Sequence, residues 1–135
     1  RVICYFIDDI YNLVNALKRQ SELIFIREKD YIQNPKPNGY RSFHVIIAVP
    51  VYYLDTMEYF PVEIQLRTMT MDLWASMEHR VCYKKLPEHR DELAEAFCQY
   101  ADILGKIEEQ FEAYNETGML EEITPAQITE NPPEG

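Results

Sequence analysis

Apolar and polar side chains alternate along several stretches of the chain, and this alternation predicts β-strands. The stretch 42–53 differs from the others because its centre, residues 45–49, is apolar on both faces. Such a pattern is typical of a central strand that is covered on both sides. The predicted strands are residues 1–6, 23–27, 42–53 and 60–68.

Two of these strands place polar side chains together on one face. Residues 60–68, FPVEIQLRT, alternate strictly, with apolar side chains on one face and an acid, an amide and a guanidinium on the other. A solvent-facing strand would show this pattern, and so would a cleft that binds a metal and phosphates. Alternation past residue 27 would likewise put Phe25, Arg27 and Lys29 on one face. The polar set of the strand 60–68 is Glu63, Gln65 and Arg67.

The stretch 27–44, REKDYIQNPKPNGYRSFH, joins two predicted strands through a stiff loop. Its two prolines bias the preceding residues to extended geometry, and Asn-Gly is a strong turn dipeptide. Lys36, Tyr40, Arg41 and His44 would project from this loop. A cation, an aromatic face and a histidine held in this way suit a nucleotide, and the alternative is a β-hairpin with a surface tyrosine.

Helical periodicity appears in two further stretches. The first follows Asp8 or Asp9, either of which would cap a helix that runs to about Arg19. The second covers residues 70–83, and Pro87 would then begin another helix. The expected core stripe of the helix 70–83 is Met71, Trp74, Met77 and Val81.

From residue 93 the apolar residues follow a heptad spacing of 4-3-4-3-4-3, flanked by acidic residues and glutamine. So narrow a stripe on so long a helix needs a partner, which is either this domain's own sheet or another subunit. The seam consists of Leu93, Phe97, Tyr100, Leu104, Ile107, Phe111 and Tyr114.

Composition limits the function classes. With 135 residues the chain is large enough for one domain with a real core, and its 47% apolar content excludes a disordered protein. Three cysteines without CxxC spacing favour neither disulfides nor a zinc site, so a reducing, cytoplasmic location is expected. No apolar run is long enough to span a bilayer.

The net charge of −10 is unevenly distributed. Residues 1–86 carry 11 basic and 10 acidic residues, whereas residues 87–135 carry 2 and 13. The first two thirds therefore remain compatible with a polyanionic ligand. Broad binding of duplex nucleic acid is disfavoured because it needs a basic face.

Three segments, REKDYIQNPKPNGYRSFH, VEIQLRT and MDLWASMEHRVCYK, resemble in sequence and order the synthetase domain of the RelA/SpoT alarmone family. The likeness is to its small (p)ppGpp synthetases, also called GTP pyrophosphokinases, and it runs from Arg1 to about Lys85. The resemblance implies an α/β fold: a mixed β-sheet flanked by helices, nucleotidyltransferase-like, with a long C-terminal helix. It also implies transfer of pyrophosphate from ATP to the 3′-hydroxyl of GDP or GTP, with Mg²⁺.

On the guanosine side, the resemblance implies that Tyr40 stacks on the guanine. Lys36, Asn38 and His44 match its companions around the guanosine nucleotide, and Gln65 matches a further substrate contact. These roles rest on motif positions.

For ATP and metal, the resemblance implies that Arg1 packs on the adenine. Arg27 and Lys29 match the basic R-x-K-D form of a motif on the ATP side. Glu63 matches a strand glutamate linked to Mg²⁺ and to activation of the 3′-hydroxyl.

The family also carries a metal-binding aspartate a few residues before the position of Arg1, and neither Asp8 nor Asp9 matches it. The chain is therefore expected to be N-terminally truncated, with the complete protein an enzyme. Alternatives for the chain are an inactive regulatory module that binds guanosine nucleotides and, less favoured, a binder of single-stranded RNA.

The expected organisation has three parts. Residues 1–86 would form the core of the synthetase domain and residues 87–118 an oligomerisation helix. Residues 119–135 would form a flexible tail. The resemblance implies a homotetramer through residues 93–114, whereas the heptads alone imply only more than one chain.

Overall fold

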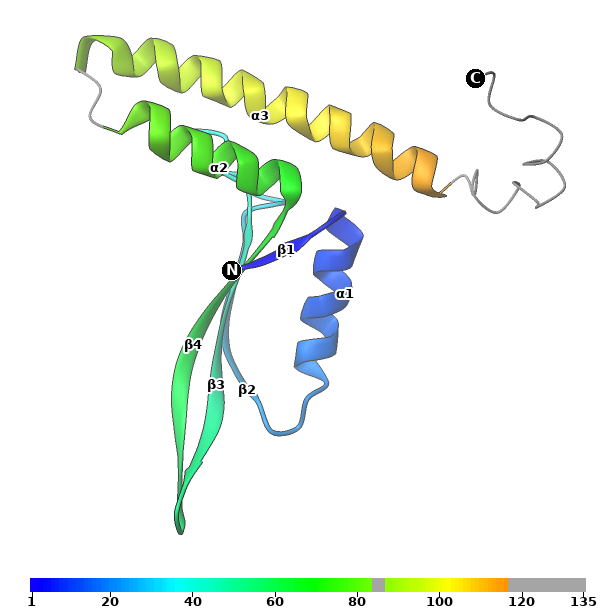
Figure 1. The fold of residues 1–135 in the computed structure, drawn as a ribbon, viewed down its shortest axis with the longest axis vertical. Helices are drawn as coiled ribbons and strands as arrows, with labels where there is room; N and C mark the ends of the chain where they lie inside the picture. Colours follow the sequence, from blue (N-terminus) through cyan, green and yellow to red (C-terminus); the bar gives the residue numbers. More distant parts are fainter. Residues whose placement is uncertain (84–86, 117–135) are drawn as a thin grey trace, which may run out of the picture.

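The computed structural model describes residues 1–83 and 87–116, so the predicted tail 119–135 lies outside the described residues. Four strands form one mixed sheet in the order β1-β4-β3-β2, in which β1 runs parallel to β4 and the other pairs are antiparallel. The predicted α/β fold with a mixed sheet, flanking helices and a long C-terminal helix is confirmed (Figure 1). The elements are β1 (Val2–Cys4), α1 (Ile7–Lys18), β2 (Ile24–Asp30), β3 (Phe43–Tyr53), β4 (Thr56–Thr68), α2 (Met69–Cys82) and α3 (Pro87–Glu116).

The main core lies between α1 and one face of the sheet. Ile10 and Val14 of α1 are buried with Val45 and Leu66 of the two interior strands. The interior position predicted for β3 is confirmed. The prediction that β3 is covered on both sides is wrong at Ile46. This half-buried residue points to the face of the sheet opposite α1 and lines an open cavity there.

A β-bulge interrupts the alternation of β2. Phe25 pairs with Ile47, and Arg27 already pairs with Ile46, so Ile26 is the extra residue. Phe25 therefore joins the core while Arg27 turns to the opposite face. The prediction that Phe25 shares a face with Arg27 is wrong, because the bulge shifts the register by one residue.

Helix α1 begins at Ile7, with Phe6 in the N-cap position two or three residues before the predicted cap. The Asp9 carboxylate accepts the backbone N–H of Phe6 at 3.0 Å. The prediction of Asp8 or Asp9 as the cap is wrong, because both residues lie in the first helical turn, where carboxylates favour the positive end of the helix dipole.

The stripe predicted for α2 is correct in its first half only. Met77 and Val81 are 46% and 36% exposed. Helix α3 packs instead against the side of α2 that carries Trp74, Ala75 and Cys82. The two helices lie side by side and run in opposite directions (Figure 1).

Helix α3 begins at Pro87 as expected, and its predicted seam divides between two faces. Phe97 is buried and Leu93 and Leu104 are half-buried against the domain. The remaining four seam residues are exposed. Together with Ile103 they form what we call the exposed strip of α3: Tyr100, Ile103, Ile107, Phe111 and Tyr114.

None of the helices in the described ranges combines the length and the hydropathy that a membrane span requires.

Candidate functional site

The loop between β2 and β3 is folded by its own backbone and by Asn38. The Lys36 carbonyl accepts the N–H of Gly39 at 2.9 Å, and the Lys36 N–H donates to the Tyr40 carbonyl at 3.1 Å. The side-chain oxygen of Asn38 accepts the N–H of Tyr40 at 3.0 Å. Gly39 has φ of +97°, a conformation that favours glycine. The predicted turn is therefore present and projects Lys36 and Tyr40 from a fixed backbone.

Asp30 fixes the point at which the chain enters this loop. Its Oδ1 accepts the N–H groups of Ile32 and Gln33, at 2.9 and 3.0 Å. Its Oδ2 accepts the hydroxyl of Tyr11 from α1 at 2.6 Å. Burial, reinforced by this hydrogen bond and by the Asp30 charge, raises the pKa of Tyr11, so the hydroxyl stays protonated and remains a donor.

Tyr40 does not project freely from the loop, because its hydroxyl is tied down. The hydroxyl lies 2.9 Å from Nε2 of His44 and accepts a hydrogen bond from Nη2 of Arg67 at 3.0 Å. Two cations lie over the ring, with Lys36 Nζ 5.2 Å and Arg67 Cζ 5.5 Å from its centroid. A base that stacks on a face of Tyr40 that one of these cations covers has to displace that cation.

The contacts of Tyr40 continue on both sides into one polar network. On one side, Nδ1 of His44 lies 3.5 Å from a carboxylate oxygen of Glu63. On the other side, Asp72 accepts from Nη1 of Arg67 at 3.3 Å and pairs with Arg1 at 3.2 Å. The network thus runs from Glu63 to Arg1 through three elements of the fold.

His44 is neutral in this setting. Burial lowers its pKa most, and the charges of Arg67, Lys36 and Lys29 act in the same direction against the opposing charge of Glu63. A neutral imidazole that accepts the Tyr40 hydroxyl at Nε2 carries its proton on Nδ1, next to Glu63. Both ring nitrogens of His44 therefore have a polar neighbour, Tyr40 at Nε2 and Glu63 at Nδ1.

Basic residues predicted for different nucleotides surround one cavity of about 140 Å³. Arg27 and Lys29 come from β2, Lys36 from the loop and His44 from β3, and Glu63 completes the set from β4. The bulge in β2 makes this convergence possible, since it turns Arg27 to the same face as His44. A carboxylate among cations suits a phosphate chain with a bound metal ion.

A second cavity, of about 480 Å³, includes Tyr40 itself in its lining. It is also lined by Arg1 and Arg67 and by the α2 residues Ala75, Ser76, Glu78 and His79. The predicted adenine-packing arginine therefore lines a different cavity from Arg27 and Lys29.

Asn38 and Gln65, which the resemblance assigns to the guanosine nucleotide, both make hydrogen bonds within the protein. The amide oxygen of Asn38 serves the loop backbone, and its side chain lines a third cavity, of about 240 Å³, beside Glu78 and α3. Gln65 accepts from Arg67 at 3.0 Å, so it orients a guanidinium.

Sequence reasoning missed Asp72 and gave Arg67 only a place on the polar face of its strand. Arg67 was visible as the last polar residue of FPVEIQLRT. Asp72 belongs to the first turn of α2, and its contacts with Arg67 and Arg1 depend on the angle at which that helix leaves β4. No spacing rule in the sequence gives that angle.

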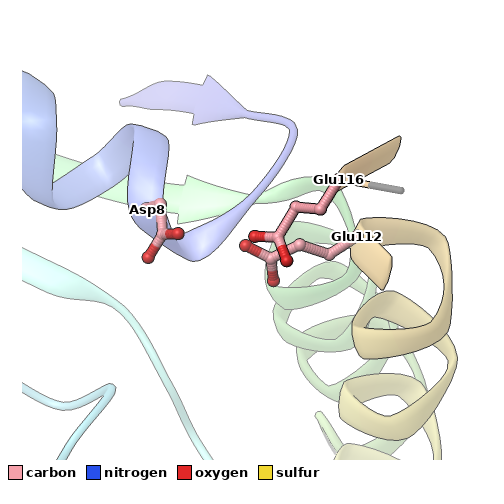
Figure 2. A group of neighbouring side chains, drawn as sticks. All are labelled: Asp8, Glu112 and Glu116. Atoms are coloured by element: carbon pink, nitrogen blue, oxygen red, sulfur yellow. The ribbon is translucent and has the colours of Figure 1, made fainter. Parts of the chain in front are cut away.

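A separate acidic group lies where α1 meets α3 (Figure 2). Glu112 and Glu116 of α3 point toward Asp8 of α1, and carboxylate oxygens of the three residues lie within 4.8 Å of one another. Burial raises the pKa of Glu112, as do the charges of Asp8, Glu116 and Glu108 and a hydrogen bond with Asp8. This group shares no residue with the polar network.

Comparisons with known proteins agree with this geometry. Residues 1–88 match the family described as a region found in RelA / SpoT proteins. GTP pyrophosphokinase YwaC from Bacillus subtilis is 47% identical over 110 residues, which are 82% of this chain and 52% of YwaC.

Two solved structures have the same fold. Small alarmone synthetase 2 from Bacillus subtilis superposes with a TM-score of 0.79 at 44% identity, covering 87% of this chain and 65% of that one. Small alarmone synthetase 1 from the same organism, bound to its product pppGpp, gives 0.75 at 28% identity, covering 85% and 58%.

The chain thus spans about half the length of YwaC and less than two thirds of either solved relative. The family match includes β1, the loop, the polar strand β4 and α2, which are the elements that supply the polar network. This chain belongs to the RelA/SpoT family.

Proposed function

We propose that the protein is a (p)ppGpp synthetase, which transfers the pyrophosphoryl group of ATP to the 3′-hydroxyl of GDP or GTP. The observation that carries the proposal is the continuous polar network from Glu63 to Arg1, with the cation-lined cavity beside it. The activities that name its relatives support the same reaction.

In this reaction the 3′-oxygen of the guanosine nucleotide attacks the β-phosphorus of ATP. The bond between the β-phosphorus and the oxygen of AMP breaks, and the hydroxyl proton leaves with a base. Glu63 is the carboxylate in position to accept that proton, with the neutral His44 beside it. Arg27, Lys29 and Lys36 would stabilise the charge on the phosphoryl oxygens.

Mg²⁺ fits this cavity as an ion that arrives with nucleotide phosphates. Glu63 supplies one carboxylate, with 52% of its side chain exposed. Glu28 also lines the cavity but pairs with Lys18 at 2.9 Å. Mg²⁺ commonly binds one or two carboxylates together with substrate phosphates and water. When bound there, it would neutralise charge on the phosphates.

The two nucleotides would occupy the two sides of Tyr40. Arg1 and the second cavity would receive the adenine, and Tyr40 would stack on the guanine after Lys36 or Arg67 moves from its ring. Displacement of Lys36 frees a cation for phosphate binding, so the guanine and the phosphates would be bound in one movement.

Association and location belong to the same proposal. The exposed strip of α3 favours a homo-oligomer, for which the family resemblance predicts a tetramer. A cytoplasmic location agrees with the three cysteines of the chain, none of which forms a disulfide.

The test is Glu63→Gln in the full-length protein. We expect synthesis of (p)ppGpp from ATP and GTP, followed by thin-layer chromatography, to fall by about a hundredfold or more, because the removed group acts in the transition state. Binding of GTP, measured by calorimetry, should stay within about threefold because the ground-state contacts remain.

The matched control is Glu58→Gln, an exposed carboxylate on the outer half of the same strand. It should leave both rate and binding unchanged. Near-normal turnover in Glu63→Gln would remove Glu63 from the mechanism. Binding of GTP without any turnover in the unmodified protein would favour an inactive nucleotide-binding module instead.

A further inference from the structure

Arg41 follows Tyr40 in the loop but takes no part in the polar network. Its guanidinium crosses to α3, where Nη2 donates to the backbone carbonyl of Ala101 at 2.7 Å. This contact joins residues 60 positions apart in the sequence. It connects the loop to α3, most of which lies beyond residues 1–88, the part of the chain that matches the family.

Gly105 makes room for this guanidinium. A Cβ atom at position 105 would lie 2.7 Å from Nη1 and 2.9 Å from Nη2 of Arg41, closer than such atoms approach. Glycine in the interior of a helix is destabilising relative to alanine. Gly105 does not have the left-handed backbone conformation that would require glycine. The close contact with Arg41 therefore explains why a residue without a Cβ atom occupies this position.

The loop backbone also packs directly on α3. A Cβ on Gly39 would meet the Cβ of Ala101 and the Cα of Cys98, each at 3.2 Å. Pro37 adds a carbonyl oxygen 3.9 Å from the sulfur of Cys98. The turn that carries Lys36 and Tyr40 therefore rests on one short segment of α3.

That segment of α3 is anchored on both sides. Before it, the indole N–H of Trp74 donates to the buried Phe97 carbonyl at 2.6 Å. After it, the Thr70 hydroxyl donates to Glu108 at 2.8 Å, and Glu108 is only 5% exposed. Two α2 side chains thus hold α3 on either side of the contact with the loop.

From these contacts we propose that α3 is the rigid support of the nucleotide-binding loop and that Arg41 and Gly105 are its positioning pair. The identity of the nucleotide rests on the proposed function, whereas the support itself does not. Neither residue touches the nucleotide; both act by fixing the turn that presents Lys36 and Tyr40.

The first experiment measures amide hydrogen exchange of residues 36–41 in the full-length protein without any nucleotide. Gly105→Ala should speed exchange in this loop, because the new methyl group displaces the Arg41 guanidinium from the Ala101 carbonyl. The same substitution should leave the thermal midpoint equal or higher, since alanine is the better helix former. A purely structural role for Gly105 would not produce this combination.

Arg41→Ala should speed exchange in the same residues without altering α3. Adding Gly105→Ala to Arg41→Ala should then have no further effect, because the two residues act through one contact. Asp102→Ala is the matched control, since it replaces an exposed residue of α3 by alanine and should leave the loop unchanged.

The second experiment measures steady-state kinetics. Both single variants should raise the KM for GTP by about tenfold while the KM for ATP stays within about twofold, because a misplaced loop weakens binding of only one substrate. Unchanged loop exchange in both folded variants would overturn the proposal that α3 supports the loop. Additive effects on loop exchange in the double variant would overturn it as well.

Faster exchange with an unchanged KM for GTP would overturn the claim that the support serves this nucleotide. Absence of any product in the unmodified protein would instead count against the proposed function, while the exchange measurement would still test the support.

Discussion

Among single residues, Arg67 connects the two sides of the candidate site. Its Nη2 donates to Tyr40 and to Gln65, and its Nη1 donates to Asp72. The side chain is 12% exposed, and its buried Nε has no hydrogen-bond partner within the described residues. Arg67 therefore connects the loop to α2 through hydrogen bonds. Its position depends on the carboxylate of Asp72.

Asp72→Asn should therefore disturb both arginines that the carboxylate holds. We expect the KM for ATP to rise because Arg1, which pairs with Asp72 at 3.2 Å, loses its partner. Stability in urea should fall by about 1–2 kcal/mol, since Arg67 keeps a buried charge with a weaker acceptor. Asp102→Asn, at an exposed position of α3, is the control.

Unchanged ATP kinetics in Asp72→Asn, together with unchanged unfolding, would mean that the two ion pairs are surface contacts of no consequence.

The residue-scale predictions from sequence succeed where a strand fixes the direction of a side chain. Glu63 and Gln65 lie on one face, as the alternation of β4 requires, and His44 pairs with Gln65 across β3 and β4 and lies 3.5 Å from Glu63. Tyr40 was expected as a projecting stacking residue. Its actual tether to Arg67 brings together groups 27 residues apart, and no local pattern contains that contact.

Among the elements, α3 differs most from a simple amphipathic helix. Its buried face carries Phe97, Ala101, Gly105 and Glu108, at successive spacings of four, four and three residues. This spacing includes a glycine and an acid, so a search for apolar residues alone places the stripe elsewhere. The heptad seam in the sequence mixes members of the buried face with members of the exposed strip.

The bulge in β2, like the buried face of α3, is a feature that the sequence did not reveal. Nothing in the run Leu23 to Arg27 marks Ile26 as an extra residue, because the run is apolar throughout its first four positions. Only pairing with β3 shows the shift. Its consequence is functional, since without it Arg27 would face the core.

The contact between α1 and α3 should depend on pH through Glu112. Its folded pKa is raised above its ordinary value of 4.5, so folding favours the protonated form. The stabilising contribution is therefore complete below the ordinary value and is lost as the pH rises through the raised one. At neutral pH the ionised Glu112 faces three other carboxylates, those of Asp8, Glu108 and Glu116.

Glu112→Gln should accordingly stabilise the protein at neutral pH. Each i,i+4 repulsion that it removes along α3 is worth about 0.2–0.5 kcal/mol. The gain should shrink at about pH 5, where the wild-type carboxyl is partly protonated. Urea unfolding at both pH values measures the difference.

Asp102→Asn is again the control, because its neighbour four residues on is Lys106, so neutralisation there should give no gain. A stabilisation of Glu112→Gln that is equal at both pH values would contradict a role for the carboxyl charge.

On the scale of the whole molecule, acidic charge and exposed apolar surface occur on the same helix. Residues 87–135 carry 2 basic and 13 acidic residues, a net charge of −11 against +1 for residues 1–86, and α3 also carries the exposed strip. The buried face of α3 packs on α2 and on the loop, so the strip is the apolar face left for another chain. An apolar strip of this length on the surface usually marks an interface.

Ile107→Glu should dissociate an oligomer formed through this strip without unfolding the protein. Ile107 is 44% exposed and lies in the middle of the strip. Light scattering should show a mass of more than one chain for the wild type and of one chain for the variant, with unchanged circular dichroism. Leu104→Glu is the contrasting substitution, because Leu104 packs against Trp74 and Phe97 and its replacement should undock α3.

Salt gives an independent test of the same interface. Acidic residues flank the strip, so two copies repel each other when they approach, and added salt screens this repulsion. Association of the wild type should therefore tighten between low and moderate ionic strength, whereas an interface held by ion pairs would weaken. A wild type that stays monomeric at every salt concentration would defeat the self-association proposal, as would an Ile107→Glu variant that keeps the wild-type mass.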